Sequence, residues 1–284
     1  MSTCNLCRTE VDAASSLLWR KDGHDVVKCP ACGLVFRADL PAAENLAQIY
    51  DEGYFRDSAN GTDRHGYADY LRDAALHRAN ARRRLRLLQG RGRLLDVGCA
   101  AGFFVSEARL AGWDASGCDV SESMVEFAVS SLELPVVRAG YAQVELPDAL
   151  DAITMWDYIE HSLDPRRDLE QAARQLRSGG VLALSTGDIG SAVARLSGRR
   201  WHLLTPEHHN FFFDEGTLRR LLADTGFDVV EARHRAGLYS VSHAVYKLGA
   251  VGRAPGVRRA AATAGKVGVP INLFDIVTVV ARRR

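Results

Sequence analysis

One segment, residues 94–102, constrains the fold of this chain more than any other. Residues 93–97 form a short apolar run that is typical of a buried parallel strand. Gly98 and Gly102 then allow the backbone to turn sharply and to approach a ligand without an obstructing Cβ atom. Residues 103–111 are expected to form the helix that follows, whose N-terminal amides attract a carboxylate. The segment therefore predicts a strand, a glycine turn and a helix, the first unit of a doubly wound α/β fold.

A lone acid, Asp119, follows the second predicted strand, residues 113–118, and lies about 20 residues beyond the glycines. At this place a carboxylate can accept hydrogen bonds from both hydroxyls of a ribose, so the unit indicates a nucleoside site. A dinucleotide site would carry the spacing G-x-G-x-x-G for the pyrophosphate, whereas residues 99–101 contain no glycine. Asp96 opens the turn, and its charge would repel a pyrophosphate but suits a ligand with an ammonium group. A glycine turn in an unrelated α/β protein is the alternative interpretation.

The glycine turn resembles the first motif of the class I methyltransferases that use S-adenosylmethionine (SAM). In that family, the acid and the glycines surround the methionine end of the cofactor. Residues 139–142, after the third predicted strand, lie where the family places the adenine, but the acid that often binds the adenine amine is missing there. The resemblance implies SAM as the cofactor and the following cofactor-binding residues: Asp96, Gly98, Cys99, Gly102, Asp119, Gly140 and Trp156.

Helices and strands alternate in the predicted core, as in a doubly wound parallel sheet. Strands are expected at residues 93–97, 113–118, 135–139, 151–156, 181–186, 227–234 and 274–281. Helices are expected at residues 103–111, 122–131, 165–177 and 215–225. The glycine pair at 179–180 marks the turn into the fifth strand. We therefore predict an α/β fold with a doubly wound, seven-stranded, Rossmann-like methyltransferase sheet and a small N-terminal zinc-ribbon module.

Two C-x-x-C pairs near the N-terminus are predicted to bind zinc. Each pair places two thiolates on one tight turn, and two such turns complete a tetrahedral shell. The four predicted ligands are Cys4, Cys7, Cys29 and Cys32. Because this shell leaves no open coordination position, we expect a structural Zn²⁺ that stabilises a module too small to build its own core. Two separate redox pairs are one alternative, and His24 in place of a thiolate is another.

The sequence predicts three regions. These are a zinc-binding module at residues 1–38, a helical linker or lid at 39–90, and the methyltransferase domain at 91–284 with a helical insertion at about 236–270. Aromatic residues in the second region either cover the cofactor cleft or join the zinc module to the core: Tyr50, Tyr54, Phe55, Tyr67 and Tyr70. Four arginines of the same region are expected on a solvated helix face: Arg82, Arg83, Arg84 and Arg86.

The composition limits the partners of the chain. It has 284 residues, and its 36 lysines and arginines nearly balance its 35 aspartates and glutamates. The chain as a whole therefore lacks the large positive net charge that attracts nucleic acid. It shows neither an apolar run of about 18 residues, as a membrane span requires, nor a signal-peptide pattern. Cys99 and Cys118 fall inside predicted core elements, which fits a reducing compartment. We therefore expect a cytoplasmic protein without membrane contact, with nucleic acid disfavoured and the oligomeric state open.

Acids and histidines follow the fourth predicted strand, at the edge of the sheet where ligands bind. Residues 157–161 read D-Y-I-E-H, and one helical turn would bring Asp157, Glu160 and His161 onto one face. Such a face makes either half of a divalent-metal site or a base with its orienting partner. A second cluster, which contains His208, follows the fifth strand. A histidine buried for structural reasons is the alternative for either imidazole alone.

The pattern D-x-x-E-H resembles the E-x-x-E-H turn of ubiquinone-biosynthesis O-methyltransferases and of small-RNA 2′-O-methyltransferases. In those families the turn holds a divalent ion, joined in the RNA enzymes by a later histidine. The resemblance implies a candidate Mg²⁺ site at Asp157, Glu160, His161 and His208, with Asp157 in place of the family glutamate. Many methyltransferases of this fold keep the Glu-His pair without a metal. In this slightly favoured interpretation, His161 or His208 is the general base that removes the acceptor proton.

The acceptor is indicated only by its class. Between Glu231 and Asp275 the chain has no acid but seven lysines and arginines, which favours either an anionic small-molecule acceptor or a solvated basic surface. Trp201 is expected either to line the acceptor pocket or to belong to the core.

Taken whole, the chain resembles bacterial class I methyltransferases with an N-terminal zinc-binding module, which are commonly linked to sugar, polysaccharide or secondary-metabolite pathways. The resemblance implies a SAM-dependent methyltransferase that moves a methyl group to a small-molecule acceptor, favouring a hydroxyl of a sugar or secondary metabolite and a His general base. One alternative is an RNA methyltransferase of the ribosomal-RNA type, against which the near-neutral charge stands. Another is a SAM-binding protein without catalysis, which has no need of the two histidines.

Overall fold

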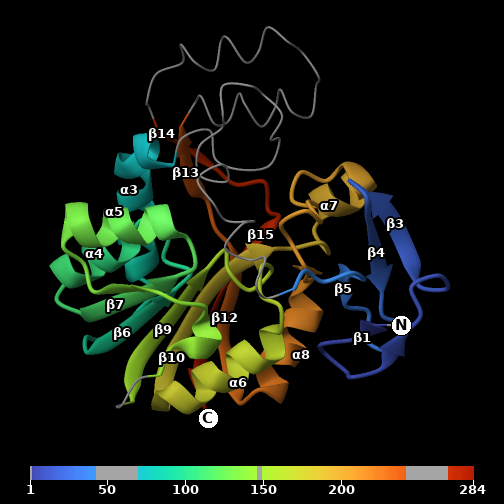
Figure 1. Ribbon diagram of the computed structural model, residues 1–284, viewed down its shortest axis with the longest axis horizontal. Coiled ribbons are helices and arrows are strands. Elements are labelled where there is room, and N and C mark those ends of the chain that lie inside the picture. Colours follow the sequence, from blue (N-terminus) through green and yellow to red (C-terminus); the bar gives the residue numbers. More distant parts are fainter. Residues whose placement is uncertain (1, 43–69, 146–148, 241–267) are drawn as a thin grey trace, which may run out of the picture.

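The computed structural model describes residues 2–42, 70–145, 149–240 and 268–284 (Figure 1). Its main sheet has seven strands in the order β12-β15-β10-β9-β6-β7-β8. Neighbouring strands run parallel except that β15 is antiparallel to both β10 and β12. The strands are β6 (Arg93–Val97), β7 (Asp114–Asp119), β8 (Val136–Arg138), β9 (Leu150–Trp156), β10 (Leu176–Gly187), β12 (Phe227–His234) and β15 (Ile276–Arg283). The predicted α/β fold with a doubly wound, seven-stranded sheet is confirmed.

Helices cover both faces of this sheet, and alternate strand residues pack against opposite helical layers. On β6, Leu94 lies in the cluster formed with α4 and α5, whereas Leu95 lies in the cluster formed with α6 and α8. Figure 1 shows α3, α4 and α5 together on one side of the molecule. The helices are η2 (Leu71–Asp73), α3 (Ala74–Leu85), α4 (Phe103–Leu110), α5 (Glu122–Leu132), η3 (Tyr141–Gln143), α6 (Pro165–Gln175), α7 (Ala192–Ser197), η4 (Gly198–Arg200) and α8 (Glu215–Asp224).

The predicted core elements agree with the structure at nearly every boundary. β6 and β12 have the predicted ends, and the other predicted elements differ by one or two residues, with one exception. The exception is β10, which begins at Leu176 and not at residue 181. The register of β10 against β9 shifts between Leu176 and Val181, and Gly179 has a φ of 72°. The glycine pair that predicted a loop therefore forms an irregularity within a longer strand.

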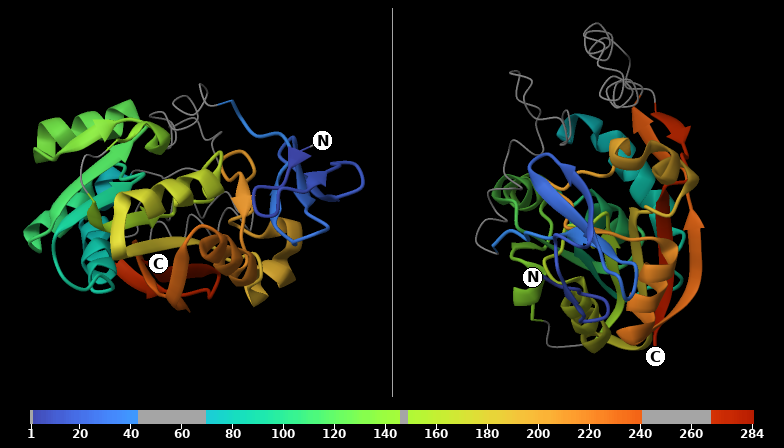
Figure 2. Two further views of the ribbon diagram at one scale, coloured as in Figure 1. Left: turned by 90° about the horizontal axis from the view of Figure 1, so that it is seen from below. Right: turned by 90° about the vertical axis from the view of Figure 1, so that its right-hand side faces the viewer.

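The N-terminal module is a small β structure whose sheet includes a strand from a much later part of the chain. Its strands are β1 (Ser2–Thr3), β2 (Glu10–Val11), β3 (Leu17–Lys21), β4 (His24–Lys28) and β5 (Val35–Arg37). A further strand, β11 (Phe211–Phe212), pairs with β5 and completes a four-stranded sheet of order β11-β5-β4-β3. Figure 2 shows the module against the segment that leads into α8. The module therefore shares a sheet with residues that follow the fifth core strand.

Two short strands lie beyond β12. β13 (Gly237–Ser240) pairs with β14 (Gly268–Ile271), and both lie beside α3. Asn80 of α3 exchanges two hydrogen bonds with the backbone of Leu238, at 2.8 and 2.9 Å. The predicted helical insertion at 236–270 is therefore wrong at both of its described ends, and its middle lies outside the described residues.

Several other predictions from the sequence also concern residues outside the described part of the chain. They include four of the five aromatic residues of the predicted lid, namely Tyr50, Tyr54, Phe55 and Tyr67. The fifth, Tyr70, stacks on His77 with ring centroids 4.0 Å apart, next to the first turn of α4. Among the described helices, none combines the length and the apolar character needed to cross a membrane.

Candidate active site

A large cleft of about 1800 Å³ opens at the carboxyl ends of β6, β7, β9 and β10. The glycine turn, the segment after β9 and residues of β12, α3 and β13 all line it. Its volume exceeds the roughly 300–1,000 Å³ that is usual for one ligand. The cleft therefore has room for a cofactor and for a second molecule beside it.

The glycine turn has the close backbone approach that the sequence predicts. Gly98 and Gly102 have φ values of 69° and 72°, in the left-handed region that favours glycine. A Cβ atom on Gly98 would lie 2.8 Å from the ring of Tyr158, and one on Gly102 would lie 2.8 Å from the side chain of Leu134. Because neither glycine leaves space for a side chain, both the shape of the turn and its packing require glycine.

Asp119 lies at the end of β7, beside the glycine turn. One carboxylate oxygen accepts a hydrogen bond from the amide of Ala100 and the other from the amide of Ser121, each at 2.8 Å. Burial raises the pKa of this carboxyl above its ordinary value. Each oxygen keeps a second lone pair, so the carboxylate is oriented and can still accept hydrogen bonds from the two hydroxyls of a ribose.

Asp96 and Cys99, predicted beside the methionine end of the cofactor, line the same part of the cleft. Asp96 is 3% exposed and accepts a hydrogen bond of 2.6 Å from the hydroxyl of Thr154. That hydrogen bond lowers the pKa of Asp96, but the larger effect of burial raises it to about 7. Gly140, predicted at the adenine, lines the cleft next to Tyr141. An opposite charge bound near Asp96 would stabilise its ionised form.

Arg84 of α3 reaches into the cleft and contacts two predicted site residues. Its guanidinium carbon lies 4.8 Å from the ring centroid of Trp156, and its Nη2 donates to Asp157 at 2.8 Å. The prediction that Arg84 lies on a solvated helix face is therefore wrong. Arg82 also has a partner, since it pairs with the buried Glu107 at 3.0 Å. Helical periodicity alone did not show which arginine of the cluster faces the sheet.

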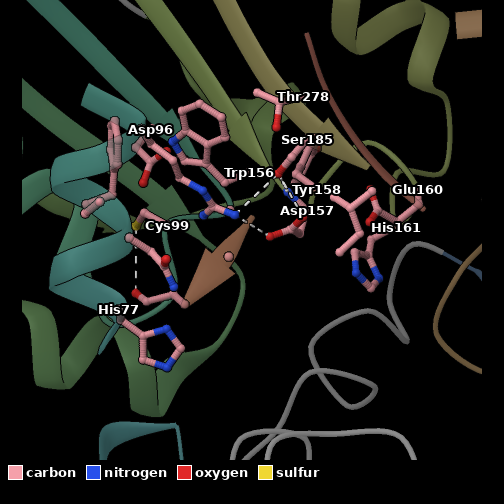
Figure 3. A pocket seen from close by; sticks show the side chains of 18 of the residues that line it. His77, Asp96, Cys99, Trp156, Asp157, Tyr158, Glu160, His161, Ser185 and Thr278 are labelled. Atoms are coloured by element: carbon pink, nitrogen blue, oxygen red, sulfur yellow. Dashed lines mark hydrogen bonds and ion pairs between the residues drawn. The ribbon is translucent and has the colours of Figure 1, made fainter. Parts of the chain in front are cut away.

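The predicted helical turn at residues 157–161 is also wrong. Asp157 has a φ of 53°, and the residues after it form turns that do not build an α-helix. The hydroxyl of Ser185 donates to Oδ1 of Asp157 at 2.8 Å, whereas Arg84 donates to the other oxygen, Oδ2. Figure 3 shows Asp157 set apart from Glu160 and His161. Asp157, directly after β9, therefore forms an ion pair with Arg84 of α3 and a hydrogen bond with Ser185 of β10.

Glu160 and His161 lie together with His209, which the sequence did not single out. One ligand atom from each of the three lies within 4.8 Å of the others. The rings of His161 and His209 meet edge to face at 4.7 Å. The candidate metal set of Asp157, Glu160, His161 and His208 is thus replaced by Glu160, His161 and His209. His208 contributes its backbone carbonyl, which accepts a hydrogen bond of 2.9 Å from Nδ1 of His161.

Burial dominates the electrostatics of this group. Glu160 is 4% exposed, and burial together with the charge of Asp157 raises its pKa to about 8. Its Oε2 makes no hydrogen bond of ordinary length within the described ranges. Burial lowers the pKa of His161 to about 4, so the ring is neutral at pH 7. A carboxylate and two imidazoles together suit a divalent transition metal, and each imidazole alone suits a base.

The four predicted zinc ligands lie together in the N-terminal module. The Sγ atoms of Cys4 and Cys32 are 3.4 Å apart, those of Cys7 and Cys29 are 3.5 Å apart, and all four lie within 4.8 Å of one another. A tetrahedral Zn–S shell with bonds of about 2.3 Å places its sulfurs about 3.8 Å apart. The described cysteines form no disulfide, so this cluster fits a zinc ion. His24 is not part of the cluster and pairs with Asp39 at 2.9 Å.

Comparisons with known proteins agree with this geometry. Residues 70–232 match the family model described as "Methyltransferase domain". Ubiquinone biosynthesis O-methyltransferase of Alkalilimnicola ehrlichii is 34% identical over 107 residues, which are 35% of this chain and 42% of that protein. The Coxiella burnetii protein of the same name is 31% identical over 99 residues, which are 33% of this chain and 42% of the Coxiella burnetii protein. The chain thus spans less than half the length of these curated relatives.

Two solved structures show the same fold. One is a SAM-dependent methyltransferase, possible histamine N-methyltransferase, from Thermotoga maritima, with a TM-score of 0.52, 18% identity and coverage of 76% of this chain and 93% of that one. The other is a SAM-dependent methyltransferase from Archaeoglobus fulgidus, with a TM-score of 0.52 and 21% identity. The match covers 74% of this chain and 94% of that one. Both structures support the fold, and the family match over more than half of its length shows that this chain belongs to the methyltransferase domain family.

Proposed function

We propose that this enzyme moves the methyl group of SAM to a hydroxyl of a small-molecule acceptor of the sugar or secondary-metabolite class, and that His161 is the general base. The observation that carries the proposal is the hydrogen bond from Nδ1 of His161 to the carbonyl of His208, at 2.9 Å. A carbonyl only accepts, so Nδ1 carries the proton and Nε2 carries the lone pair. The names of the curated relatives support O-methylation of a small molecule.

The residues of the cofactor end fit SAM by their chemistry. Asp96 supplies a buried carboxylate for the ammonium group, and Asp119 supplies two oxygens for the ribose hydroxyls. Gly98 and Gly102 leave the backbone open to close approach, and Gly140 lines the cleft beyond β8. When bound, SAM supplies an electrophilic methyl group on a sulfonium. The chain itself then supplies alignment, exclusion of water and a proton acceptor.

In the reaction, the acceptor oxygen forms a bond to the methyl carbon as the bond from that carbon to sulfur breaks. The hydroxyl proton passes to Nε2 of His161, and the hydrogen bond to His208 holds the ring in place during the transfer. The imidazolium that forms next to Glu160 lowers the pKa of that carboxyl and favours its ionised form, which in turn stabilises the imidazolium.

One observation favours a second mechanism for the same reaction. Glu160, His161 and His209 bring three metal-ligating atoms within 4.8 Å, and the Oε2 atom of Glu160 makes no hydrogen bond of ordinary length among the described residues. A divalent ion at this group would polarise the acceptor oxygen and lower the pKa of its hydroxyl. In this mechanism His161 is a ligand and not a base.

The test uses His161→Gln and His209→Gln and follows release of S-adenosylhomocysteine with a panel of catechol and glycoside acceptors. Loss of the base lowers kcat by about 10²- to 10⁴-fold in His161→Gln, with the Kd for S-adenosylhomocysteine unchanged. If protein that retains its cysteine-bound zinc loses activity on dialysis against EDTA and regains it with Mg²⁺ or with a divalent transition metal such as Mn²⁺, the metal mechanism is correct. Unchanged kcat in His161→Gln would contradict both mechanisms.

A further inference from the structure

Asp168 is a buried acid in the first turn of α6, and the chemistry derived so far does not use it. It is 7% exposed, and it lines the same cleft as the glycine turn. Because α6 follows the carboxyl end of β9 and begins at Pro165, its first turn lies at the edge of the sheet where ligands bind. Asp168 is therefore a candidate for contact with a ligand.

The two oxygens of the Asp168 carboxylate have different surroundings. Oδ2 accepts hydrogen bonds from the hydroxyls of Tyr158 and Ser162, at 2.9 and 2.6 Å. Oδ1 accepts no hydrogen bond from any residue that the structure describes. A buried acceptor without a partner lowers stability, and a ligand that donates a hydrogen bond would remove this cost. The two hydroxyls fix the orientation of the carboxylate for such a ligand.

α6 places Asp168 beside the segment that follows β8. Gln171 of this helix donates to the carbonyls of Tyr141 and Val144, at 2.7 and 3.2 Å. Gln175 also donates to the carbonyl of Val144, at 2.7 Å. Asp168 precedes these glutamines by three and seven residues, so it lies on the same helix face and nearer to the cleft. Its charge accordingly contributes to raising the pKa of Tyr141, after the main effect of burial.

Two tyrosines lie between Asp168 and the glycine turn. The ring of Tyr158 packs against Gly98, since a Cβ atom there would lie 2.8 Å from it, and its hydroxyl bonds to Asp168. The ring of Tyr141 meets the ring of Tyr158 edge to face, with centroids 6.5 Å apart. Both tyrosines line the cleft. This end of the cleft therefore combines aromatic surface with a carboxylate oxygen, which suits a flat base that carries a donor.

The order of the strands determines which part of SAM would reach Asp168. Asp119 ends β7, Asp96 lies on β6 at one side of it, and the segment after β8 lies at the other side. In the proposed complex Asp119 binds the ribose and Asp96 binds the ammonium group. Because the ribose of SAM lies between its methionine and its adenine, the adenine extends over the segment after β8.

The segment after β8 supplies no acid for the exocyclic amine of adenine. Residues 139–143 read A-G-Y-A-Q, and the side-chain oxygen of Gln143 already accepts a hydrogen bond of 3.1 Å from the amide of Gly140. The hydroxyl of Tyr141 donates to Oε1 of Gln175 at 2.8 Å. A carboxylate oxygen only accepts hydrogen bonds, so Oδ1 of Asp168 suits an amine and disfavours a carbonyl oxygen at the same place.

We propose that Oδ1 of Asp168 accepts a hydrogen bond from the exocyclic amine of the adenine, so that this acid of α6 replaces the one missing after β8. The inference rests on the proposed function, because it takes SAM as the ligand at Asp96 and Asp119. Asp168 thereby selects adenine over hypoxanthine, in which a carbonyl oxygen replaces the amine. Tyr158 and Ser162 are positioning residues, since their hydroxyls act on the base through the carboxylate.

The experiment measures the Kd values of S-adenosylhomocysteine and S-inosylhomocysteine for the full chain by calorimetry. The wild type should bind the inosine compound about 10- to 100-fold more weakly, because one hydrogen bond to a charged group is lost. In Asp168→Asn, the amide oxygen still accepts from Tyr158 and Ser162, which places the amide nitrogen where Oδ1 was. We therefore expect this variant to bind S-adenosylhomocysteine about 10- to 100-fold more weakly and S-inosylhomocysteine more tightly than the wild type does.

Asp164→Asn is the matched control. Asp164 caps the same helix, because its Oδ1 accepts from the amide of Arg167 at 3.0 Å, but it does not line the cleft. Asparagine is about as good a cap as aspartate. The variant thus removes one negative charge from the same helix terminus, and the ratio of the two Kd values should equal that of the wild type.

The inference is overturned if the ratio of the two Kd values is the same in Asp168→Asn and in the wild type. It is also overturned if the wild type binds both compounds equally, a result that does not depend on the folding of any variant. In either case, tight binding of S-adenosylhomocysteine would leave the proposed function standing. If the wild type binds neither compound, the proposed cofactor is wrong and the inference fails with it.

Discussion

The N-terminal module is predicted to hold the segment that carries His209 in place, and Arg37 is the residue that tests this. Arg37 is 8% exposed, and its Nη1 donates to the carbonyl of Pro206 at 3.1 Å. Its amide also donates to the carbonyl of Asn210 at 2.8 Å, which continues the pairing of β5 with β11. Arg37→Met keeps the strand and most of the side-chain volume but removes the guanidinium.

The magnitude follows from the group that loses its partner. The carbonyl of Pro206 is buried, and a buried acceptor that loses a charged donor costs about 2 kcal/mol. This energy destabilises the segment 203–213 relative to its locally unfolded form. At about 1.4 kcal/mol per factor of ten, hydrogen-exchange protection there should fall about 30-fold. The reporting amides are those of Asn210 and Phe211, which donate to the carbonyl of Glu160 at 2.7 and 3.1 Å.

Hydrogen exchange with mass spectrometry measures this change in the peptide that covers 203–213. Arg20→Met is the matched control, because Arg20 lies on β3 of the same sheet but is largely exposed and pairs only with Asp25 in the contacts described. Peptides of β6 should keep their protection, and the Kd for S-adenosylhomocysteine should not change, while methyl transfer slows. Unchanged protection at 203–213 in Arg37→Met would refute the idea that the module supports this segment.

Three further predictions concern the cofactor end and the zinc site. Gly98→Ala should abolish measurable SAM binding in calorimetry and lower stability by about 1–3 kcal/mol, because the new Cβ meets Tyr158 at 2.8 Å and the φ of 69° is unfavourable; retained binding would contradict this. The folded pKa of Asp96, about 7, lies above its unfolded value, so the carboxyl lowers stability increasingly as the pH rises from about 4 to 7. Urea unfolding should therefore show Asp96→Asn gaining up to about 4 kcal/mol on the wild type across this range and no more above it; a constant difference would disprove the assignment. Cys29→Ser should lose the metal in elemental analysis and lower protection at 203–213 in the same way as Arg37→Met; full zinc content in this variant would exclude the four-thiolate site.

The geometry of the proposed cofactor end of the cleft could be predicted from the sequence because it is built by contiguous residues. A strand, a glycine turn and a helix leave a local pattern, and Asp119 follows at a spacing that the same βαβ unit sets. The ends of β6 agree with the prediction, since the change from apolar residues to glycine is sharp there. Cys99 and Gly140 also line the cleft as expected.

The group after β9 could not be predicted in the same way. The backbone of Asp157 depends on Ser185 and Arg84, which are far away in the sequence, and their contacts hold it in a conformation that no helical pattern indicates. The choice of His209 over His208 depends on the strand that follows it. β11 pairs with β5, and the register of Phe211 against Phe36 determines which of two adjacent histidines lies beside Glu160.

This difference between the two ends has a physical consequence for the enzyme. The cofactor end belongs to one folding unit, so its geometry depends on local contacts, whereas the acceptor end joins the N-terminal module, the segment before α8 and the strands β10, β12 and β15. Asn5 shows this coupling, because its side chain bonds to Asp164 at 2.7 Å, at the start of the helix that follows Glu160 and His161. Loss of zinc or of one such contact should therefore change acceptor turnover before it changes cofactor binding. The N-terminal module is in this sense a structural part of the proposed acceptor site.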